Sequence, residues 1–410
     1  MDRNIEALDN NDPLAELRGE FLLPANTIYL DGNSLGPLPR AAAERARITV
    51  EQEWAMDLIA SWNSHGWIEL PVKTGEKIAP IIGAGPGQVI CCDSISVNLF
   101  KLLTVALQLQ EGRNVIVSQQ DNFPSDLYMG QGLSRLLGEE RCQFRMVEES
   151  ALQSALTDDV AVLLLSQVNF RDGSVHDMAR LTAKAHQQGI LVIWDLAHSA
   201  GVLPLAVDDW QVDFAVGCGY KYLNGGPGAP AFVYVNKRHH GQFQQPLQGW
   251  MGHQAPFEFS PQYRAASGMA GFLVGTPPIL SLAVLDEALE LFAKVSLQQL
   301  RAKSLALSNL FIELVDEHPA LQSLQLRSPR QESRRGSQLA FAHPQAYAIC
   351  QALIAEGVIA DFRSPDLLRF GFSPLVLRFQ DIVDSVRILD RIVTSELFLA
   401  PQFQKRRKVT

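Results

Sequence analysis

The sequence contains little cysteine, and its cysteines show no paired spacing. Five cysteines are spread over 410 residues, with no CxxC pair and no group of cysteine and histidine at the spacing of a zinc site. A disulfide framework and a bound metal are therefore not expected. Isolated thiols of this kind are typical of a protein from a reducing cytoplasm.

Long apolar runs and an excess of positive charge are also missing. No stretch of about 18 apolar residues predicts a membrane helix, and Met1–Glu20 mixes charged with apolar residues, unlike a secretory leader. The chain has 35 Lys and Arg against 44 Asp and Glu, a net charge of −9, which argues against nucleic acid as a partner. With 47% hydrophobic residues it can bury a large core. We expect a globular cytoplasmic protein that binds neither a membrane nor nucleic acid.

Short apolar segments alternate with helical patterns in the middle of the chain. Continuous apolar strands are typical of strands covered on both faces, and their alternation with helices predicts a mainly parallel sheet. The expected strands are residues 115–118, 143–147, 160–166, 190–195, 214–218 and 231–235. The expected helices between them are residues 98–110, 125–137 and 178–188. The sequence therefore predicts an α/β fold with helices on both faces of the sheet.

The last third of the chain has a different pattern. Two long amphipathic helices over residues 279–295 and 297–317 precede a strand-like QLAFA, a helix over residues 345–356, the strand-like VIADFR and LLRFGFS, and a final helix near residues 381–397. The first fifty or so residues precede the α/β core and carry their own helix. We therefore predict a large α/β domain over residues 66–285, and a smaller, discontinuous α+β domain made of residues 1–65 and 286–410.

Residues that follow the expected strands are candidates for a site, because open parallel sheets bind ligands beyond the carboxyl ends of their strands. They offer an acid, an amine, aromatic rings and hydroxyl groups: Phe123, Ser166, Asp195, His198, Tyr220 and Lys221. Each has an ordinary alternative as a cap, turn, surface or core residue. Only their combination favours a catalytic site over these structural roles.

Lys221 and Asp195 together suggest a cofactor. A lysine amine can form a Schiff base with a carbonyl, and pyridoxal phosphate (PLP) needs such a lysine and a carboxylate facing its ring nitrogen. The phosphate also needs a cradle, and Ser96 lies in DSISVN at the start of an apolar helix, where backbone N–H groups bind anions. From spacing alone, Ser96 is either a phosphate contact or a simple helix cap.

Several motifs, in order along the chain, resemble those of kynureninases. They are YLDGNSLGPLP (29–39), FPSD (123–126), DLAHSAG (195–201), GYKYLNGGPGAPAFVYV (219–235), GWMGH (249–253) and GTPPIL (275–280). The lysine motif alone is typical of the wider group of fold-type-I PLP enzymes, similar to class V aminotransferases. The full set runs from about residue 28 to Arg369 and is far more specific.

The resemblance implies a PLP-dependent transferase-like fold with a mainly parallel, seven-stranded sheet. It also implies hydrolysis of L-kynurenine to anthranilate and L-alanine in tryptophan catabolism, on a route toward NAD biosynthesis, by a homodimer with shared active sites. Whether 3-hydroxy-L-kynurenine is also cleaved stays open. The aryl-pocket residues are not assigned.

The resemblance also implies roles for individual residues. Lys221, Tyr220 and Asp195 are the implied catalytic residues: the Schiff-base lysine and proton shuttle, a proton donor or acceptor, and the partner of the ring nitrogen. The implied cofactor-binding set is Ile95, Ser96, Phe123, Pro124, Ser125, Asp126, Ser166, Asp195, His198, Tyr220, Lys221, Trp250 and Thr276. Trp250 and Thr276 would reach the phosphate from the neighbouring subunit.

Five further positions also carry expectations. Arg369 in LLRFGFSPL is the implied clamp for the substrate α-carboxylate, a task that suits a bidentate guanidinium. Asn33 and Ser34 lie in a family motif without an assigned role. His65, with Trp67, is either at the border of the aryl pocket or an ordinary core or rim residue.

Two other functions compete with this hypothesis. A cysteine desulfurase or selenocysteine lyase would need a mobile catalytic cysteine, for which Cys350 is the candidate, although its apolar helical pattern favours a buried thiol. A non-catalytic ligand-binding protein could lose Lys221 or Asp195 without penalty, yet both are present.

Overall fold

The structure, a computed structural model, describes residues 4–406. Residues 1–3, which begin the segment expected to lack an apolar leader, lie outside the described residues, as do residues 407–410. In the described part, no helix is long and apolar enough to cross a membrane.

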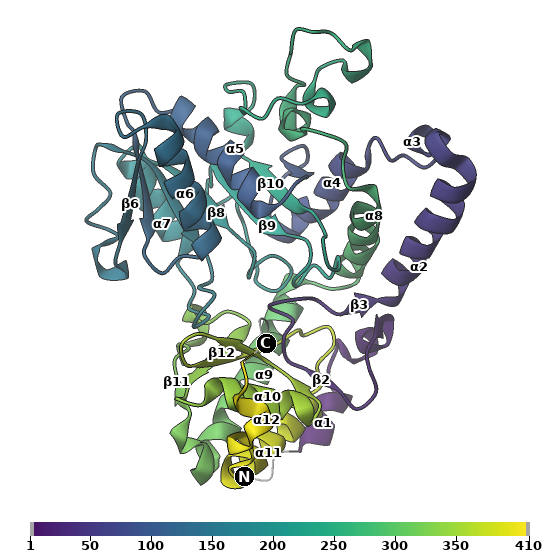
Figure 1. Ribbon diagram of the computed structural model, residues 1–410, viewed down its shortest axis with the longest axis vertical. Helices are drawn as coiled ribbons and strands as arrows, with labels where there is room; N and C mark the ends of the chain where they lie inside the picture. Colours follow the sequence, from purple (N-terminus) through teal and green to yellow (C-terminus); the bar gives the residue numbers. More distant parts are fainter. Residues whose placement is uncertain (1–3, 407–410) are drawn as a thin grey trace.

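A seven-stranded sheet forms the centre of the larger part of the molecule (Figure 1). Its strand order is β4-β10-β9-β8-β7-β5-β6, and β10 alone runs antiparallel to its neighbours. The strands are β4 (Val89–Cys91), β5 (Val115–Gln119), β6 (Gln143–Val147), β7 (Val160–Ser166), β8 (Leu191–Asp195), β9 (Phe214–Cys218) and β10 (Ala231–Val235). The mainly parallel α/β fold is thus confirmed. The three-residue β4 was not among the expected strands.

Helices cover both faces of this sheet because successive side chains of each strand point to opposite sides. In β5, Val115 and Val117 belong to one hydrophobic cluster and Ile116 to another. The first cluster includes residues of α4 (Leu70–Ile82), α7 (Met178–Gln187) and α8 (Ile279–Ala288). The second includes residues of α5 (Ile95–Gln108) and α6 (Pro124–Leu137).

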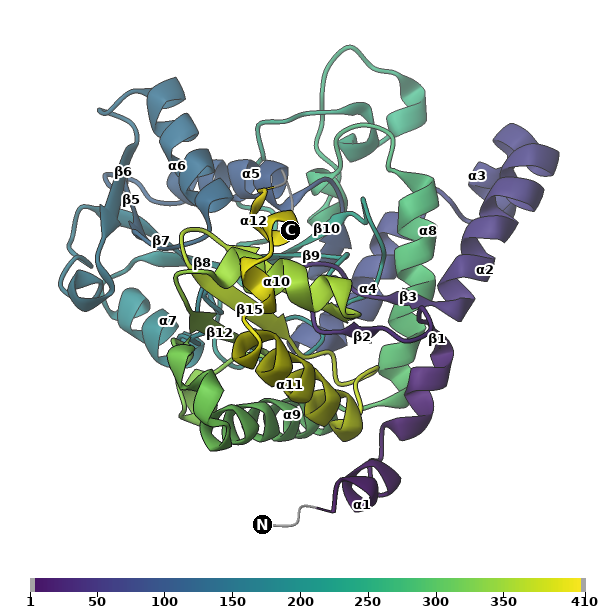
Figure 2. The ribbon, with the colours of Figure 1, turned by 60° about the horizontal axis from the view of Figure 1, so that its bottom comes forward.

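The smaller part is built on a four-stranded antiparallel sheet of order β11-β12-β15-β14, seen from below in Figure 2. Its strands are β11 (Gln325–Leu326), β12 (Gln338–Ala342), β14 (Asp361–Arg363) and β15 (Leu367–Gly371). Its helices are α9 (Leu297–Glu317), α10 (Ala346–Ala355), α11 (Phe379–Thr394) and α12 (Pro401–Gln404). A separate hydrophobic cluster fills this part.

The beginning of the chain contacts both parts. Leu14, Phe21 and Leu30 join the hydrophobic cluster of the smaller part, and β2 (Ile28–Tyr29) pairs with β13 (Val358–Ile359). The next segment instead lies beside the larger part, where α2 (Arg40–Ile48) packs against α8 (Figure 1). The domain boundaries expected near residues 65 and 285 stay a prediction.

Two segments differ from the sequence-based expectation. The helix expected over residues 279–295 is α-helical only to Ala288 and then continues as a 3-10 helix, Leu289–Lys294. The strand-like VIADFR is divided between β13, which pairs with β2, and β14, which pairs with β15. Hydrophobic pattern alone does not show where a run of this kind changes partner.

Candidate active site

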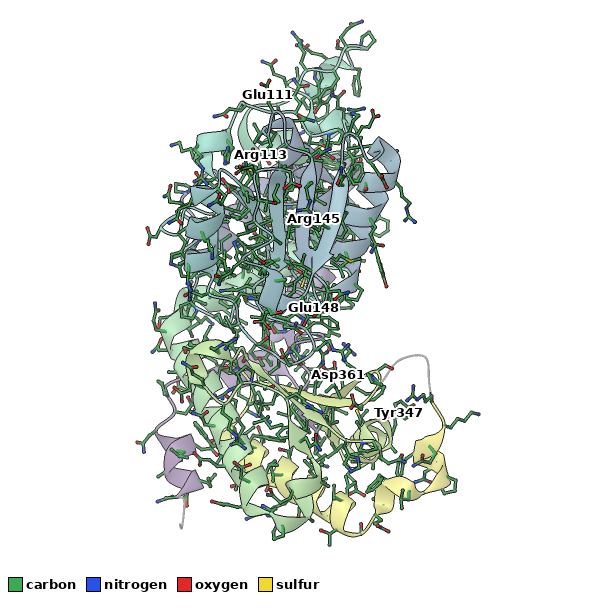
Figure 3. All side chains as sticks on the ribbon, turned by 90° about the vertical axis from the view of Figure 1, so that its left-hand side faces the viewer. Glu111, Arg113, Arg145, Glu148, Tyr347 and Asp361 are labelled. Atoms are coloured by element: carbon green, nitrogen blue, oxygen red, sulfur yellow. The ribbon has the colours of Figure 1, made fainter. Side chains whose placement is uncertain are left out.

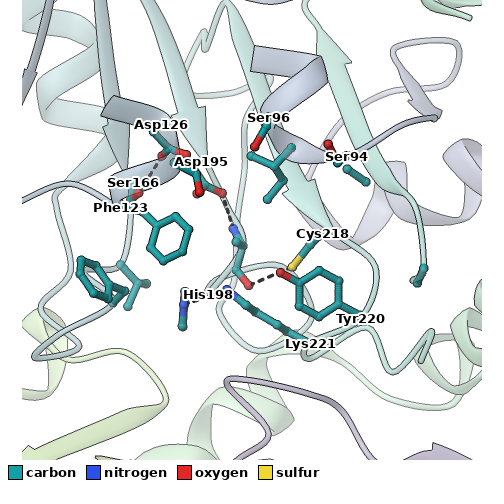
Figure 4. A pocket seen from close by; sticks show the side chains of 17 residues that line it. Ser94, Ser96, Phe123, Asp126, Ser166, Asp195, His198, Cys218, Tyr220 and Lys221 are labelled. Atoms are coloured by element: carbon teal, nitrogen blue, oxygen red, sulfur yellow. Dashed lines mark hydrogen bonds between the residues drawn. The ribbon is translucent and has the colours of Figure 1, made fainter. Parts of the chain in front are cut away.

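A pocket lies at the carboxyl ends of β5, β7, β8 and β9 (Figure 4). This is the edge at which an open parallel sheet binds ligands. Most of the expected site residues line it: Ile95, Ser96, Phe123, Ser125, Asp126, Ser166, Asp195, His198, Tyr220 and Lys221. The structure therefore brings together side chains that the sequence places after four separate strands.

Lys221 follows β9 and is only 9% exposed. Its Nζ lies 2.9 Å from His198 Nε2 and 5.8 and 5.9 Å from the ring centroids of Phe123 and Tyr220. An ammonium group only donates, so His198 Nε2 accepts this hydrogen bond and Nδ1 carries the imidazole hydrogen. Burial and the positive charge of Lys221 lower the pKa of His198, which keeps the imidazole neutral.

Two buried carboxyl groups lie beside each other in the pocket (Figure 4). Asp195, at the end of β8, accepts the Ala197 N–H at 2.8 Å, while Asp126 Oδ2 lies 3.4 Å from Ser166 Oγ. Burial raises the pKa of both acids, and the charge of Asp195 raises that of Asp126 further. A protonated ring nitrogen beside these groups would favour their ionised form.

The aromatic wall of the pocket comes from Phe123 and Phe170. Phe123 precedes α6 and contacts the Phe170 ring edge to face, with centroids 5.2 Å apart. Pro124 occupies the first position of α6, where its fixed φ suits a helix start, and it does not line the pocket. Its contribution is therefore to the helix that carries Ser125 and Asp126.

The N-terminus of α5 forms another wall. Ser94 is the helix cap, since its side chain accepts the Val97 N–H at 3.4 Å. Ser96 is therefore not the cap, and it lines the pocket together with Ser94 and Ile95. First-turn N–H groups have no partner within their helix and favour an anion such as a phosphate.

Two buried polar atoms of the pocket, Asp126 Oδ1 and His198 Nδ1, have no hydrogen-bond partner within residues 4–406. Such atoms are costly unless a ligand or water satisfies them. Together with the Lys221 amine and the α5 N-terminus, they suit a molecule with an aldehyde, a ring nitrogen and a phosphate. The residues present therefore fit PLP.

Trp250 and Thr276 do not line this pocket. Trp250 is 38% exposed and its ring lies 5.9 and 6.5 Å from those of Phe257 and Phe259. Thr276 is exposed in the segment before α8. The structure therefore leaves both residues on the surface of their own chain.

Arg369 lies on β15 and is 1% exposed, behind the pocket lining. Its Nε donates to Asp361 Oδ1 at 2.7 Å, its Nη2 donates to Asp361 Oδ2, and its Nη1 donates to the carbonyl oxygen of Phe170. The same carbonyl accepts from Gln338 Nε2 at 3.1 Å. A guanidinium has five N–H donors, so these contacts leave two for an anion.

Asn33 and Ser34, which had no assigned role, contact the surroundings of Arg369. Asn33 Nδ2 lies 3.3 Å from Gln338 Oε1, and Ser34 Oγ donates to Asp361 Oδ2 at 2.7 Å. The YLDGNSLG motif therefore contacts the surroundings of the arginine and also the lysine segment, where the Gly36 N–H donates to the Tyr220 carbonyl oxygen at 2.8 Å.

His65 follows α3 (Ser61–Ser64) and does not line the pocket. Its Nε2 lies 2.7 Å from Asp57 Oδ2, and its Nδ1 lies 3.7 Å from Glu53 Oε1. Trp67 Nε1 donates to Glu53 Oε2 at 2.9 Å. Within this chain, both residues belong to a polar cluster away from Lys221.

Some lining residues were not expected from the sequence: Ser94, Val168, Phe170, Ala197, Cys218, Ala229 and Ala231. Phe170 could have been found, because it follows β7 by four residues, at the edge where the other candidates lie. Asp361 gave no comparable signal, since its contact with Arg369 depends on the register of β14 against β15.

A lysine and a carboxylate at the ends of neighbouring strands, an aromatic wall and a helix N-terminus, on a mainly parallel seven-stranded sheet, define a fold-type-I PLP-dependent enzyme. Solved structures with this fold include a C-DES variant with glycine covalently linked to its PLP cofactor (TM-score 0.78, 18% identity, covering 91% of this chain and 98% of that one). An apo cysteine desulfurase from Thermococcus onnurineus NA1 matches with a TM-score of 0.76 at 17% identity, covering 96% of this chain and 99% of that one.

The sequence comparisons are more specific. Residues 300–389 match the model of the kynureninase C-terminal domain. Kynureninases from Burkholderia pseudomallei (strain 1106a) and Pseudomonas fluorescens are 50% and 46% identical to this chain, each over 98% of both chains. The chain belongs to the kynureninase family, which makes it a PLP-dependent hydrolase of carbon–carbon bonds.

Proposed function

We propose that this enzyme hydrolyses L-kynurenine to anthranilate and L-alanine in tryptophan catabolism, on a route toward NAD biosynthesis, as a cytoplasmic homodimer. The relatives named kynureninase support the substrate. The observation that carries the proposal is the Lys221 amine, 2.9 Å from His198 Nε2, in one pocket with Asp195. These are the groups that bond to an aldehyde and hold a pyridinium nitrogen.

In this proposal the pocket residues hold PLP at defined points. Asp195 pairs with the ring nitrogen, Asp126 supports that pair, and Phe123 stacks on the ring. The α5 N-terminus at Ile95 and Ser96 binds the phosphate, with Tyr220 beside it. The remaining contacts are assigned to Ser125, Ser166 and His198, with Pro124 setting the start of α6.

Bound PLP would supply an electron-accepting ring and an aldehyde that can bond to an amine. Lys221 would be the base that removes the α-proton of the substrate and later returns protons. Asp195 keeps the ring nitrogen protonated. Water adds to the γ-carbonyl, and the Cβ–Cγ bond breaks to release anthranilate. Tyr220 is assigned to proton transfer at the β-carbon, since burial raises its phenol pKa and keeps it protonated.

Arg369 is assigned to the α-carboxylate of the substrate. Its two remaining N–H groups match the two oxygens of a carboxylate. Its contact with the Phe170 carbonyl places it directly behind a lining residue. This position supports recognition of an amino acid.

The homodimer is part of the proposal because two assigned residues lie outside their own pocket. Trp250 and Thr276 are exposed, as residues that complete the site of a partner must be in the isolated chain. The exposed rings of Phe257 and Phe259 beside Trp250 add apolar surface there.

A cysteine desulfurase activity is less well supported. Cys350 is fully buried in α10, and its thiol lies 3.4 Å from the Ala360 carbonyl oxygen. Cys218 does line the pocket, but it ends β9, and burial raises its pKa. Neither is a mobile thiolate of the kind that attacks sulfur.

The test is the visible spectrum of the purified protein with PLP, together with anthranilate fluorescence after addition of L-kynurenine. Lys221→Ala should lose the band of the lysine-bound cofactor and at least about 10³-fold in turnover, because the amine that moves the protons is gone. Lys237→Ala, at an exposed lysine, is the matched control.

A Lys221→Ala protein with the normal band and normal turnover would contradict the scheme, as would a wild-type protein that releases no anthranilate. Parallel assays with 3-hydroxy-L-kynurenine measure the ring preference. An assay of sulfide from cysteine tests the desulfurase alternative.

A further inference from the structure

Four charged side chains form a compact group around Arg369, here called the Arg369 cluster: Asp31, Asp361, Arg363 and Arg369. The cluster lies behind the pocket lining, and Figure 3 shows Asp361 in the smaller part near its junction with the larger one. The role inferred for this cluster rests on the proposed function, in which Arg369 binds a substrate carboxylate.

Asp361 holds the arginine in a fixed orientation. It lies directly opposite Arg369 on the neighbouring strand, and both of its oxygens accept from the guanidinium. Arg363 Nη2 also lies 3.0 Å from Asp361 Oδ2, and Ser34 Oγ donates to the same oxygen. A two-point contact of this kind fixes the plane of the guanidinium, and hence the direction of its free N–H groups.

Asp31 is the second acid of the cluster, and it is not paired in the same way. Its Oδ1 is buried and has no hydrogen-bond partner within residues 4–406. Burial and the negative charge of Asp361 raise the pKa of Asp31 to about 7, while Ser34 and Arg369 act in the opposite direction. Asp31 therefore changes charge in the neutral range.

The other titratable groups that face the cluster from neighbouring elements are uncharged near neutral pH. Burial raises the pKa of the two phenols and the thiol and lowers that of the imidazole. These groups are Tyr29, Tyr222, Cys350 and His198. The net charge of the site therefore depends on Asp31.

The charges balance in only one protonation state once a carboxylate is bound. With both acids ionised, two arginines face two carboxylates and the cluster is neutral before the substrate arrives. A substrate carboxylate would then add a third, unbalanced negative charge in a buried place, which is costly. With Asp31 protonated, the incoming carboxylate neutralises the remaining positive charge.

We propose that Asp361 orients Arg369 for the substrate α-carboxylate, and that Asp31 takes up a proton as this carboxylate binds. Both are positioning residues, because they act through Arg369 and not on the reacting atoms. Binding of an amino acid is thereby coupled to proton uptake, whereas binding of an amine without a carboxylate is not.

The test compares two probes on the PLP-loaded enzyme: L-alanine, and L-2-aminopropan-1-ol, which keeps the amine and methyl group but lacks the carboxylate. Dissociation constants come from the change in the visible cofactor band between pH 6 and pH 8.5. The ratio of the two constants isolates the effect of the carboxylate from pH effects that the two amines share. In the wild type, the preference for L-alanine should fall about three- to tenfold across this range, as the charge of Asp31 develops.

Asp31→Asn should hold the preference at its low-pH value throughout, because the amide keeps the uncharged form. Asp158→Asn, which removes an exposed acid, should follow the wild type. Asp361→Asn should weaken the binding of L-alanine and leave the binding of the amino alcohol unchanged. An Asp31→Asn protein whose preference follows the wild-type curve overturns the proposal.

Ser34→Ala gives a second test if Asp31→Asn does not fold. The Ser34 hydroxyl donates to Asp361 and lowers the pKa of both Asp361 and Asp31, so its removal should move the midpoint of the wild-type curve to higher pH. An unmoved midpoint counts against the role of Asp31. Failure to form anthranilate would instead contradict the proposed reaction. The two tests are separate because neither probe needs to be hydrolysed.

Discussion

Asp31, Asp126 and Asp195 are carboxylic acids whose surroundings oppose their ionisation. Burial raises the pKa of each, and Asp31 and Asp126 also face the charge of a second acid. A group of this kind binds its proton more tightly in the folded chain than in the unfolded one. Its contribution to stability is therefore present at low pH and is lost as the pH rises through the folded pKa.

The effect of Asp31 on the pH dependence of stability can be measured. Its pKa rises from about 3.9 in an unfolded chain to about 7 in the folded one, so the wild type should lose this stabilisation between those pH values. Asp31→Asn removes that loss, and its melting temperature relative to the wild type should rise from pH 5 to pH 8. Thermal unfolding of both proteins, with Asp158→Asn for comparison, measures the difference. Parallel pH profiles would contradict the assignment.

Site residues that lie at or just after the end of a strand can be predicted from the sequence. Asp195 and Lys221 follow buried apolar strands, so their common edge can be predicted from the chain alone. Asp361 and Asp31 cannot be found in this way. The pairing of Asp361 with Arg369 depends on strand register, and the position of Asp31 depends on its backbone bridge to Gly371; both are long-range features.

At the scale of elements, one carboxylate accepts hydrogen bonds from several elements of the large sheet and its helices. Asp213 precedes β9, and its Oδ2 accepts from His186 of α7 at 2.8 Å and from the β8 N–H of Val192 at 2.8 Å. Its Oδ1 accepts from His239 at 2.7 Å and from Arg238, both next to β10. Hydrogen bonds from His186 and His239, together with the charges of His186 and Arg238, hold the pKa of Asp213 below its usual range although burial opposes this.

Asp213→Asn should therefore cost about 3 kcal/mol of unfolding free energy at neutral pH, since it leaves buried donors and charges without their partner. Because the pKa is lowered in the folded state, the wild-type advantage should persist above about pH 4 and disappear as the pH falls below it. Urea unfolding at several pH values measures this. Asp159→Asn, in an exposed pair with Arg145, is the control and should cost less than about 1 kcal/mol. Equal losses in both variants would refute the role of Asp213.

Most strands of the large sheet could be predicted because they are buried and largely apolar runs of five to seven residues, although β6, with Gln143 and Arg145, is more polar and more exposed. β4 was missed because three residues carry too little pattern. The antiparallel direction of β10 could not be predicted either, since the apolar pattern of a strand does not indicate its orientation in the sheet. Only the short connection through residues 219–230 and the pairing itself decide it.

At the scale of the whole molecule, two groups of exposed apolar side chains are prominent within residues 4–406. One is the group of Trp250, Phe257 and Phe259, and the other is the projecting segment from α2 to α3, where Met56 and Ile59 are 75% and 80% exposed (Figure 1). Surfaces of this kind mark contacts with other proteins. They agree with a proposed dimer in which each chain completes the pocket of the other.

Mixing two damaged proteins tests this arrangement. Trp250→Ala should weaken PLP binding in the partner's site, and Lys221→Ala should inactivate its own. If the residues act across the interface, dissociation and reassociation of an equal mixture should restore about a quarter of the wild-type sites, because each mixed dimer regains one intact pocket. Anthranilate formation measures the recovery, with each variant alone as the baseline. No recovery, in mixtures shown to contain mixed dimers, would place Trp250 in its own site.

The carbonyl oxygen of Phe170 accepts hydrogen bonds from Gln338 and Arg369, which both belong to the small sheet. The small sheet therefore positions a residue that lines the pocket. The ring of the same residue contacts Phe123 edge to face and lines the pocket that contains Lys221. Substitutions that shift β12 or β15 should therefore reshape the aromatic wall without replacing any residue that is proposed to hold the cofactor. Inherited variation in the small sheet is thus a route by which descendants of one ancestor can acquire new substrates, and directed evolution can begin there.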